Sequence, residues 1–230
     1  MRRYLYLFII ALSCIVRQTA TAQTTIRNYD IKNGMPDNSV NCIAQDGSGF
    51  VWIGTSNGLS RFDGMFFTVF RHDNDDSSTI ANNNIHAIYT CQKGVYFSTD
   101  KGIDFYDYQD NKFHHCTLNG QTIGKRVMNI EATSRGLFAT DENGKLLSIS
   151  GTVLKHIQRS LKVYGIAAVD GPKGQGANLF AVCDEKVVLL TADAGRWVSI
   201  LHTPLIGRTS TKAYFSRNQR KVFVGNGIGT

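Results

Sequence analysis

Short strand-like runs alternate with glycine-rich turns through most of the chain. In the clearest segment, Val40–Gln45 and Phe50–Thr55 flank the turn DGSG, and Leu59–Phe62 follows the turn SNG. Short runs of β-branched and aromatic residues bounded by glycine and asparagine are typical of strands joined by tight hairpins. Outside the first 20 residues, no long stretch has apolar residues at helical spacing. The pattern predicts an all-β protein.

This unit repeats about every 40–45 residues. Gly58 in the first copy corresponds to Gly102 in the second, and Val51–Thr55 to Val95–Thr99. The central strands of weaker copies lie at Gly136–Thr140, near Phe180 and near Phe223. Each copy has room for four short antiparallel strands, which is the size of a β-propeller blade. Helical repeats need a 3.6-residue period, and leucine-rich repeats need a shorter unit.

The resulting fold prediction is an incomplete β-propeller with four-stranded blades, about four and a half of them. The blades are expected to start near residues 38, 84, 127, 163 and 211. Ile26–Ile31 is expected to be an additional strand, of the kind that completes the last blade of a closed propeller.

The N-terminus has the features of a secretory signal peptide. Arg2 and Arg3 precede the apolar run Leu5–Val16, and Ala20–Ala22 offers a small-x-small cleavage site. We expect residues 1–22 to be the signal peptide and 23–230 the partial propeller, exported to the periplasm. Lipidation at Cys14 and an uncleaved anchor are alternatives. No later apolar run is long enough to span a membrane, which takes about 20 residues.

Charge and cysteine usage narrow the function classes. The formal net charge is +7, and part of it belongs to the three arginines of the signal peptide. The remaining charges are scattered, so no nucleic-acid surface is predicted. Four cysteines follow the signal peptide, without a C-x-x-C pair that would indicate zinc. Whether they pair cannot be read from their positions, which are Cys42, Cys91, Cys116 and Cys183.

Three segments resemble a known family. Asp46–Asp63, DGSGFVWIGTSNGLSRFD, resembles the two-component regulator propeller repeat. The segment His72–Ile85 is similar to the linker between blades in that family, and Tyr29–Val40 to the start of its sensor region. The match is strongest to hybrid two-component sensors that control glycan utilisation in gut bacteria.

The resemblance implies a sensor rather than an enzyme. Family propellers are periplasmic, bind oligosaccharides, are generally dimeric, and precede a membrane helix and a histidine kinase. This sequence contains no kinase motif, so kinase activity would belong to a longer parent protein. About seven blades are typical of the family, so we expect this chain to be a truncated product or a fragment. The alternatives are an exported propeller enzyme acting on glycans and a non-functional remnant.

Two groups of residues could suggest a metal site. His114 and His115 lie near Asp107 and Asp110, and Asp73–Asp76 is similar to the start of a calcium loop. The first group fits a hairpin and an outer strand, and the second lacks the glycine and terminal glutamate of a calcium loop. We therefore predict no metal and no cofactor.

No catalytic residues are predicted. Asp46–Trp52 departs from the sialidase Asp-box because Ser48 stands where that motif has glycine. Trp52 could stack on a sugar, but its counterparts in the other repeats are all apolar, which favours a core position. Ligand-binding residues are left unassigned. Polar residues near the blade entries could contribute to binding: Asn82–Asn84, His86, Asn129 and Tyr164.

Overall fold

The computed structural model describes residues 26–133, 136–157, 162–169, 178–183, 186–193, 196–204, 212–216 and 221–225. Its strands form antiparallel meanders, in which consecutive strands of the chain are neighbours in a sheet. Four consecutive meanders have four strands each, and a two-stranded hairpin follows them. The predicted all-β propeller with four-stranded blades is therefore confirmed. The predicted signal peptide, residues 1–22, lies outside the described residues.

The first sheet consists of β1 (Val40–Gln45), β2 (Val51–Thr55), β3 (Gly58–Phe62) and β4 (Phe67–Phe70). The second consists of β5 (Ile85–Cys91), β6 (Gly94–Thr99), β7 (Gly102–Asp107) and β8 (Lys112–His115). The third contains β11 (Val127–Thr133), β12 (Gly136–Asp141), β13 (Leu146–Ser150) and β14 (Val153–His156). The fourth contains β15 (Gly165–Val169), β16 (Asn178–Val182), β17 (Lys186–Asp193) and β18 (Arg196–Pro204). The final hairpin is β19 (Lys212–Ser216) and β20 (Lys221–Gly225).

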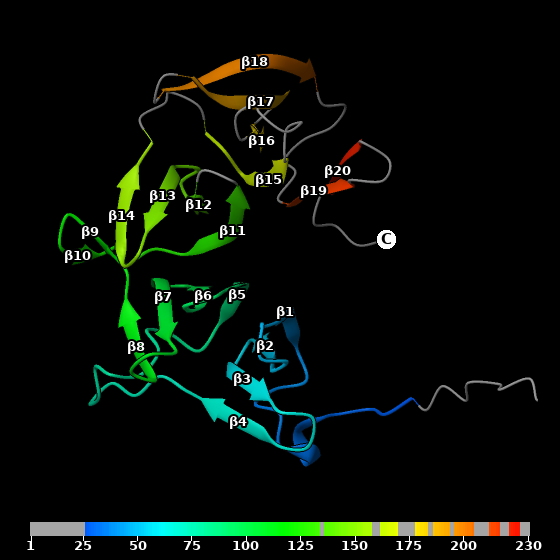
Figure 1. Cartoon of the computed structure of the whole chain (residues 1–230), viewed down its shortest axis with the longest axis vertical. Helices are drawn as coiled ribbons and strands as arrows, with labels where there is room; N and C mark the ends of the chain where they lie inside the picture. Colours follow the sequence, from blue (N-terminus) through cyan, green and yellow to red (C-terminus); the bar gives the residue numbers. More distant parts are fainter. Residues whose placement is uncertain are drawn as a thin grey trace, which may run out of the picture.

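The sheets are arranged as propeller blades around an arc (Figure 1). Their first strands, β1, β5, β11, β15 and β19, contact one another in sequence. Hydrophobic cores lie between neighbouring sheets. Between the first two sheets, Trp52 and Leu59 pack with Val95 and Phe97, and all four are fully buried. Burying one large apolar side chain contributes about 1.5–3 kcal/mol, so each blade is stabilised by the next.

A repeated turn joins the second and third strands of the first two sheets. Thr55 Oγ1 donates to the Gly58 carbonyl at 2.8 Å and accepts from the Asn57 amide at 3.1 Å. Thr99 makes the same two bonds in the second sheet. The turn glycine has a φ of 132° in the first sheet, in the region that L side chains avoid. The predicted strand–turn–strand pattern is confirmed here.

The third sheet corrects the predicted repeat alignment by one residue. In the first sheet Val40 pairs with Thr55, and in the third Val127 pairs with Asp141. Asp141, rather than Thr140, therefore occupies the threonine position of the turn. Its Oδ1 accepts from the amides of Asn143 and Lys145. The turn it holds is longer than the threonine turns, since Thr140 pairs with Leu146 whereas Thr55 pairs with Gly58.

The predicted strand at Ile26–Ile31 is wrong for the described residues. Residues 26–30 form no strand, and Ile31–Asn33 form a short 3-10 helix, η1. The side chains of Asp30 and Asn33 cap this turn. Asp30 Oδ1 accepts from the Lys32 amide, and Asn33 Oδ1 accepts from the Asp30 amide. A strand needs a partner to satisfy its backbone. This segment has none among the described strands, so its local hydrogen bonds determine its conformation.

A small hairpin absent from the sequence prediction extends the third sheet. The strands β9 (Thr117–Leu118) and β10 (Gln121–Thr122) join its outer edge, where β9 runs parallel to β14. The hairpin covers the outer strand of the third blade, in the way that natural proteins protect sheet edges.

Among the described residues, no helix has the length and apolar character needed to cross a bilayer.

Candidate functional site

A β-bulge opens the first strand of each of the first three blades. The register of β1, β5 and β11 shifts after the first pair, and the residue without an opposite partner is Asn41, His86 or Met128. Such bulges turn a side chain away from the regular alternation and are common beside functional sites. In β15 the pairing is uninterrupted. The bulges place polar side chains at one end of the first two blades, beside the blade entries.

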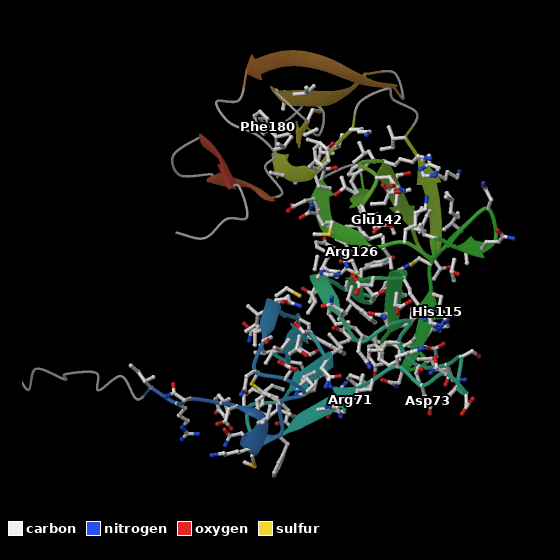
Figure 2. The ribbon with its side chains drawn as sticks, turned by 180° about the vertical axis from the view of Figure 1, so that it is seen from behind. Arg71, Asp73, His115, Arg126, Glu142 and Phe180 are labelled. Carbon is white, nitrogen blue, oxygen red and sulfur yellow. The ribbon has the colours of Figure 1, made fainter. Side chains whose placement is uncertain are left out.

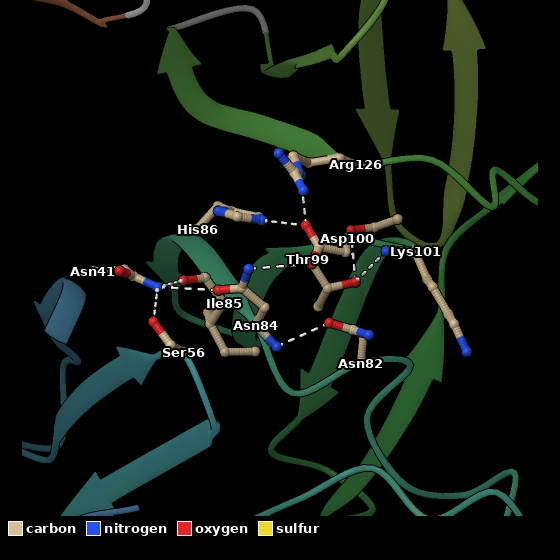
Figure 3. A network of polar contacts seen from close by, with 11 residues as sticks. Asn41, Ser56, Asn82, Asn84, Ile85, His86, Thr99, Asp100, Lys101 and Arg126 are labelled. Atoms are coloured by element: carbon tan, nitrogen blue, oxygen red, sulfur yellow. Dashed lines mark hydrogen bonds and ion pairs between the residues drawn. The ribbon is translucent and has the colours of Figure 1, made fainter. Parts of the chain in front are cut away.

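Asn41 connects the first blade to the second (Figure 3). Its Nδ2 donates to the Ile85 carbonyl at 2.9 Å and to Asn84 Oδ1 at 3.2 Å. The hydroxyl of Ser56, from the turn between β2 and β3, lies 3.5 Å from the same nitrogen. The bulged residue of one blade therefore holds the entry segment of the next.

Asp100 is the centre of the same arrangement. It follows Thr99 in the turn between β6 and β7, and its carboxylate accepts from three side chains. Asn84 Nδ2 lies at 3.1 Å, His86 Nε2 at 2.7 Å and Arg126 Nε at 2.6 Å. Burial alone raises the pKa of Asp100, but these hydrogen bonds outweigh it and hold the pKa below its ordinary value. The carboxylate is therefore ionised at neutral pH.

We call Asn41, Ser56, Asn84, His86, Asp100 and Arg126 the Asp100 network. Arg126 lies at the entry of β11, so the network joins elements of the first three blades (Figure 3). Its backbone carbonyl also accepts from the amide of Glu142 at 2.9 Å, and Figure 2 shows these two residues side by side. The network therefore connects three blades by hydrogen bonds.

Several hydrogen-bonding groups of this region face solvent. The side chain of Arg126 is 47% exposed, and within the described part of the chain its two terminal nitrogens have no hydrogen-bond partner. Lys101, next to Asp100, is exposed as well. Planar guanidinium and amide groups suit bidentate contacts with vicinal hydroxyls or carboxylates. The site can therefore recognise a polar ligand, while Asp100 keeps its donors in fixed positions.

The structure brings together only some of the residues expected near the blade entries. Asn84 and His86 belong to the Asp100 network, while Asn82 accepts from the Asn84 amide. Asn83 has a structural role, since its side chain accepts from the His72 amide and its carbonyl from the Gly58 amide.

Asn129 and Tyr164 meet one blade further on. Asn129 Nδ2 donates to Thr140 Oγ1 at 3.2 Å and lies 3.4 Å from the Tyr164 carbonyl. No predicted site residue corresponds to Asn41, Ser56, Asp100 or Arg126. For two of them the sequence does contain a signal, because Ser56 and Asp100 each directly follow the turn threonine of their repeat.

Trp52 is a core residue and not a sugar platform, because it is fully buried. Its Nε1 donates to Asp46 Oδ2 at 2.8 Å, and the hydroxyl of Tyr108 donates to the same oxygen at 2.7 Å. Asp46 Oδ1 accepts from the amides of Ser48 and Phe50. Asp46 thus holds the first hairpin turn and joins it to the second blade.

The histidine pair is divided between two surroundings. Asp107, Asp110 and His114 have ligand atoms within 4.8 Å of one another, whereas His115 bonds to Asp104 at 2.7 Å. Two carboxylates of the first group also cap turns, with Oδ1 of each accepting a backbone amide. His114 Nε2 lies 2.9 Å from Asp110. The group is therefore held by hydrogen bonds, and the prediction of no metal stays a prediction.

The acidic segment between the first two blades is a series of capped turns. Asp73 Oδ1 accepts from the Asp75 amide at 2.9 Å. Asp76 Oδ1 accepts from both the amide and the hydroxyl of Ser78. These bonds stabilise the turns of the linker, and the absence of a calcium site there stays a prediction.

The cysteines of the described residues differ in burial. Cys42 and Cys91 are partly buried, and Cys116 and Cys183 are buried. Burial, with a smaller effect of Asp104, raises the pKa of Cys116 to about 12. A thiol with so high a pKa is a poor nucleophile, so Cys116 serves as a small core residue.

Comparisons with known proteins agree with the fold. The sequence model described as two component regulator propeller matches residues 34–57. The histidine kinase P4 of Formosa agariphila is 41% identical over 49 residues, which are 21% of this chain and 4% of that protein. Two similar solved structures are extracellular domains of Bacteroides thetaiotaomicron proteins.

One of these extracellular domains belongs to a hybrid two component system. It has a TM-score of 0.60 at 21% identity, over 86% of this chain and 31% of its own. A second, described as part of a one component system, has a TM-score of 0.64 at 19% identity, over 88% of this chain and 27% of its own. A surface component of the type-IX secretion system of Porphyromonas gingivalis has a TM-score of 0.57 at 14% identity, over 85% of this chain and 26% of its own. Because these identities are low, the likeness of the three structures to this chain shows a shared fold and nothing about a shared role.

Proposed function

We propose that this chain, which carries a two-component regulator propeller repeat at residues 34–57, is the periplasmic ligand-sensing region of a hybrid two-component sensor. Extracellular domains of two bacterial signalling systems, one described as a hybrid two component system and one as a one component system, share the fold of this chain. The chain spans about a third or less of those structures and a small part of the similar histidine kinase. Kinase activity is accordingly assigned to a longer parent protein.

The Asp100 network is the proposed ligand site, and an oligosaccharide is the proposed ligand. The observation that carries this is the partly buried carboxylate of Asp100, which accepts hydrogen bonds from Asn84, His86 and Arg126. Sugar hydroxyls are bound by such fixed donors and acceptors, because each hydroxyl can donate and accept at once. Preorganised groups lose little freedom on binding, which favours affinity.

Signalling would follow from the position of the network between blades. A ligand that bonds to Arg126 and to the entry of the second blade favours the arrangement in which β5 and β11 are correctly spaced. Differential binding of one arrangement is the only way a ligand can shift a conformational equilibrium. The parent protein would transmit that shift to its kinase.

The test is calorimetric titration of the purified chain with a panel of neutral and acidic oligosaccharides. One member should bind, and Arg126→Ala should weaken it by about 10–100-fold, because a hydrogen bond to a charged group contributes about 1.5–3 kcal/mol. Lys112→Ala is the matched control, since Lys112 is an exposed cation on the outer strand β8. Its affinity should equal that of the wild type.

Two results would overturn the proposal. One is the absence of binding by any oligosaccharide to a sample that unfolds cooperatively. The other is equal affinity in the wild type and Arg126→Ala. Release of sugar products during the titration, followed by chromatography, would instead show an exported enzyme.

A further inference from the structure

A small cavity lies between the β9–β10 hairpin and the third blade. It has a volume of about 240 Å³. On one side it is lined by the hairpin and the loop that follows, and on the other by Asp141, Lys145 and His156. The hairpin is held there by the parallel pairing of β9 with β14. The cavity therefore exists because this blade has two more strands than its neighbours.

The lining of the cavity is basic. Lys125 and Lys145 line it together with His156, against a single carboxylate, Asp141. Asp141 is 3% exposed, and its Oδ1 is occupied by two backbone amides. In the described residues no carboxylate lies within ion-pair distance of either lysine. The cavity thus presents two cations that no anion of the described structure neutralises.

The remaining lining groups are those that bind hydroxyls. Asn119, Gln121 and Thr122 line the cavity, and Leu118 and Ile123 are its apolar lining residues. Pockets for drug-sized ligands have volumes of about 300–1,000 Å³, so this one suits a group of about the size of a single sugar. Amides, a hydroxyl and two ammonium groups together match a sugar that carries an anionic substituent.

We infer that this cavity binds an acidic sugar, with Lys125 and Lys145 contacting its carboxylate or sulfate. The inference rests on the proposed sensory function and identifies the ligand class as an acidic glycan. Lys125 directly precedes Arg126, the residue that donates to Asp100. Occupation of the cavity would therefore fix the entry to β11, and through Arg126 the spacing of the second and third blades.

The experiment titrates the full purified chain with four probes: glucuronate, glucose 6-sulfate, glucose and inorganic sulfate. At least one acidic sugar should bind, and the comparison of the first two separates a carboxylate site from a sulfate site. Lys145→Gln should weaken binding by about 10–100-fold, because a charge-assisted hydrogen bond is lost. Lys155→Gln, an exposed lysine on β14 that does not line the cavity, should leave affinity unchanged. A thermal unfolding curve for each variant checks that it is folded.

Several results would overturn the inference. These are equal binding of glucose and the acidic sugars, binding of inorganic sulfate as tight as that of the sugars, or no effect of Lys145→Gln in a folded sample. Arg126→Ala separates this inference from the proposed function. Loss of neutral-oligosaccharide binding in Arg126→Ala, with no effect of Lys145→Gln on any acidic sugar, would refute the cavity alone.

Discussion

His115 fixes the linker between the first two blades, and its replacement should destabilise the protein in a pH-dependent way. Nδ1 of His115 lies 2.7 Å from Asp104 Oδ1, and Nε2 lies 3.0 Å from the Ser77 carbonyl. Asp104 is 1% exposed, and its other oxygen accepts from the Ala81 amide at 2.7 Å. One histidine thus connects β7, β8 and the linker.

Both nitrogens of the ring face acceptors, so both bonds form only in the imidazolium. The hydrogen bond to Asp104 raises the pKa of His115 above its ordinary value, against the opposing effect of burial. A group whose pKa is raised by folding stabilises the protein fully below its unfolded pKa of about 6.5. This stabilisation disappears as the pH rises through the folded value.

The structure sets the magnitude. His115→Ala removes a hydrogen bond between charged groups, which contributes about 1.5–3 kcal/mol. It also leaves the buried Asp104 with fewer partners, and breaking a buried pair costs about 3–5 kcal/mol. Because the His115 side chain is 28% exposed, water can replace part of the lost contact. We therefore expect a loss of about 2–4 kcal/mol in the free energy of unfolding at pH 5.5.

The assay is urea unfolding followed by tryptophan fluorescence, since Trp52 lies in the core between the first two blades. The difference between the wild type and His115→Ala should shrink between pH 5.5 and pH 9. Asp104→Asn and the double variant complete a cycle, and the coupling energy should shrink in parallel. A difference below about 0.5 kcal/mol, or one that is the same at both pH values, would refute the assignment of an imidazolium bonded to Asp104.

Three further predictions concern the core and the turns. Gly54→Ala should lower the free energy of unfolding by about 1–3 kcal/mol, because a Cβ there would lie 2.5 Å from a thiol sulfur and 2.7 Å from an isoleucine methyl. Gly47→Ala, with nothing within 4 Å of its Cβ, is the control in the same urea titration. Asp46→Ala should cost about 2–4 kcal/mol, because a buried indole N–H loses its acceptor; an unchanged melting temperature would contradict that role. In the native protein a maleimide should modify the partly buried Cys91 before Cys116, whose pKa is about 12, and mass spectrometry of timed samples shows the order.

Much of the fold could be predicted because its signals are local. The turn at Asn57-Gly58 needs a residue with positive φ, and a threonine two residues earlier holds it. Trp52 was correctly placed in the core because equivalent positions of other repeats are apolar. The third blade shows the limit of this approach. Asp141 replaced the threonine of the turn, so matching Thr140 to Thr55 shifted the alignment by one residue.

The candidate site could be predicted only in part. His86 and Asn84 were noticed as polar residues at a blade entry, but Asp100 and Arg126 are separated from them in sequence by a strand or more. Their association depends on the bulge at His86 and on the packing of β5 against β11. Neither feature has a sequence pattern of its own.

Residues close together in the chain specify the repeating four-stranded unit, the turns within it and the resemblance to two-component regulator propellers, so these could be predicted from the sequence. Which polar groups meet depends instead on the tertiary structure. The Asp100 network joins three blades, and the basic cavity depends on the edge pairing of β9 with β14. Hydrogen bonds and charge pairs act over a few ångströms. Which residues come that close is set by how the blades pack, and each blade's own sequence leaves that open.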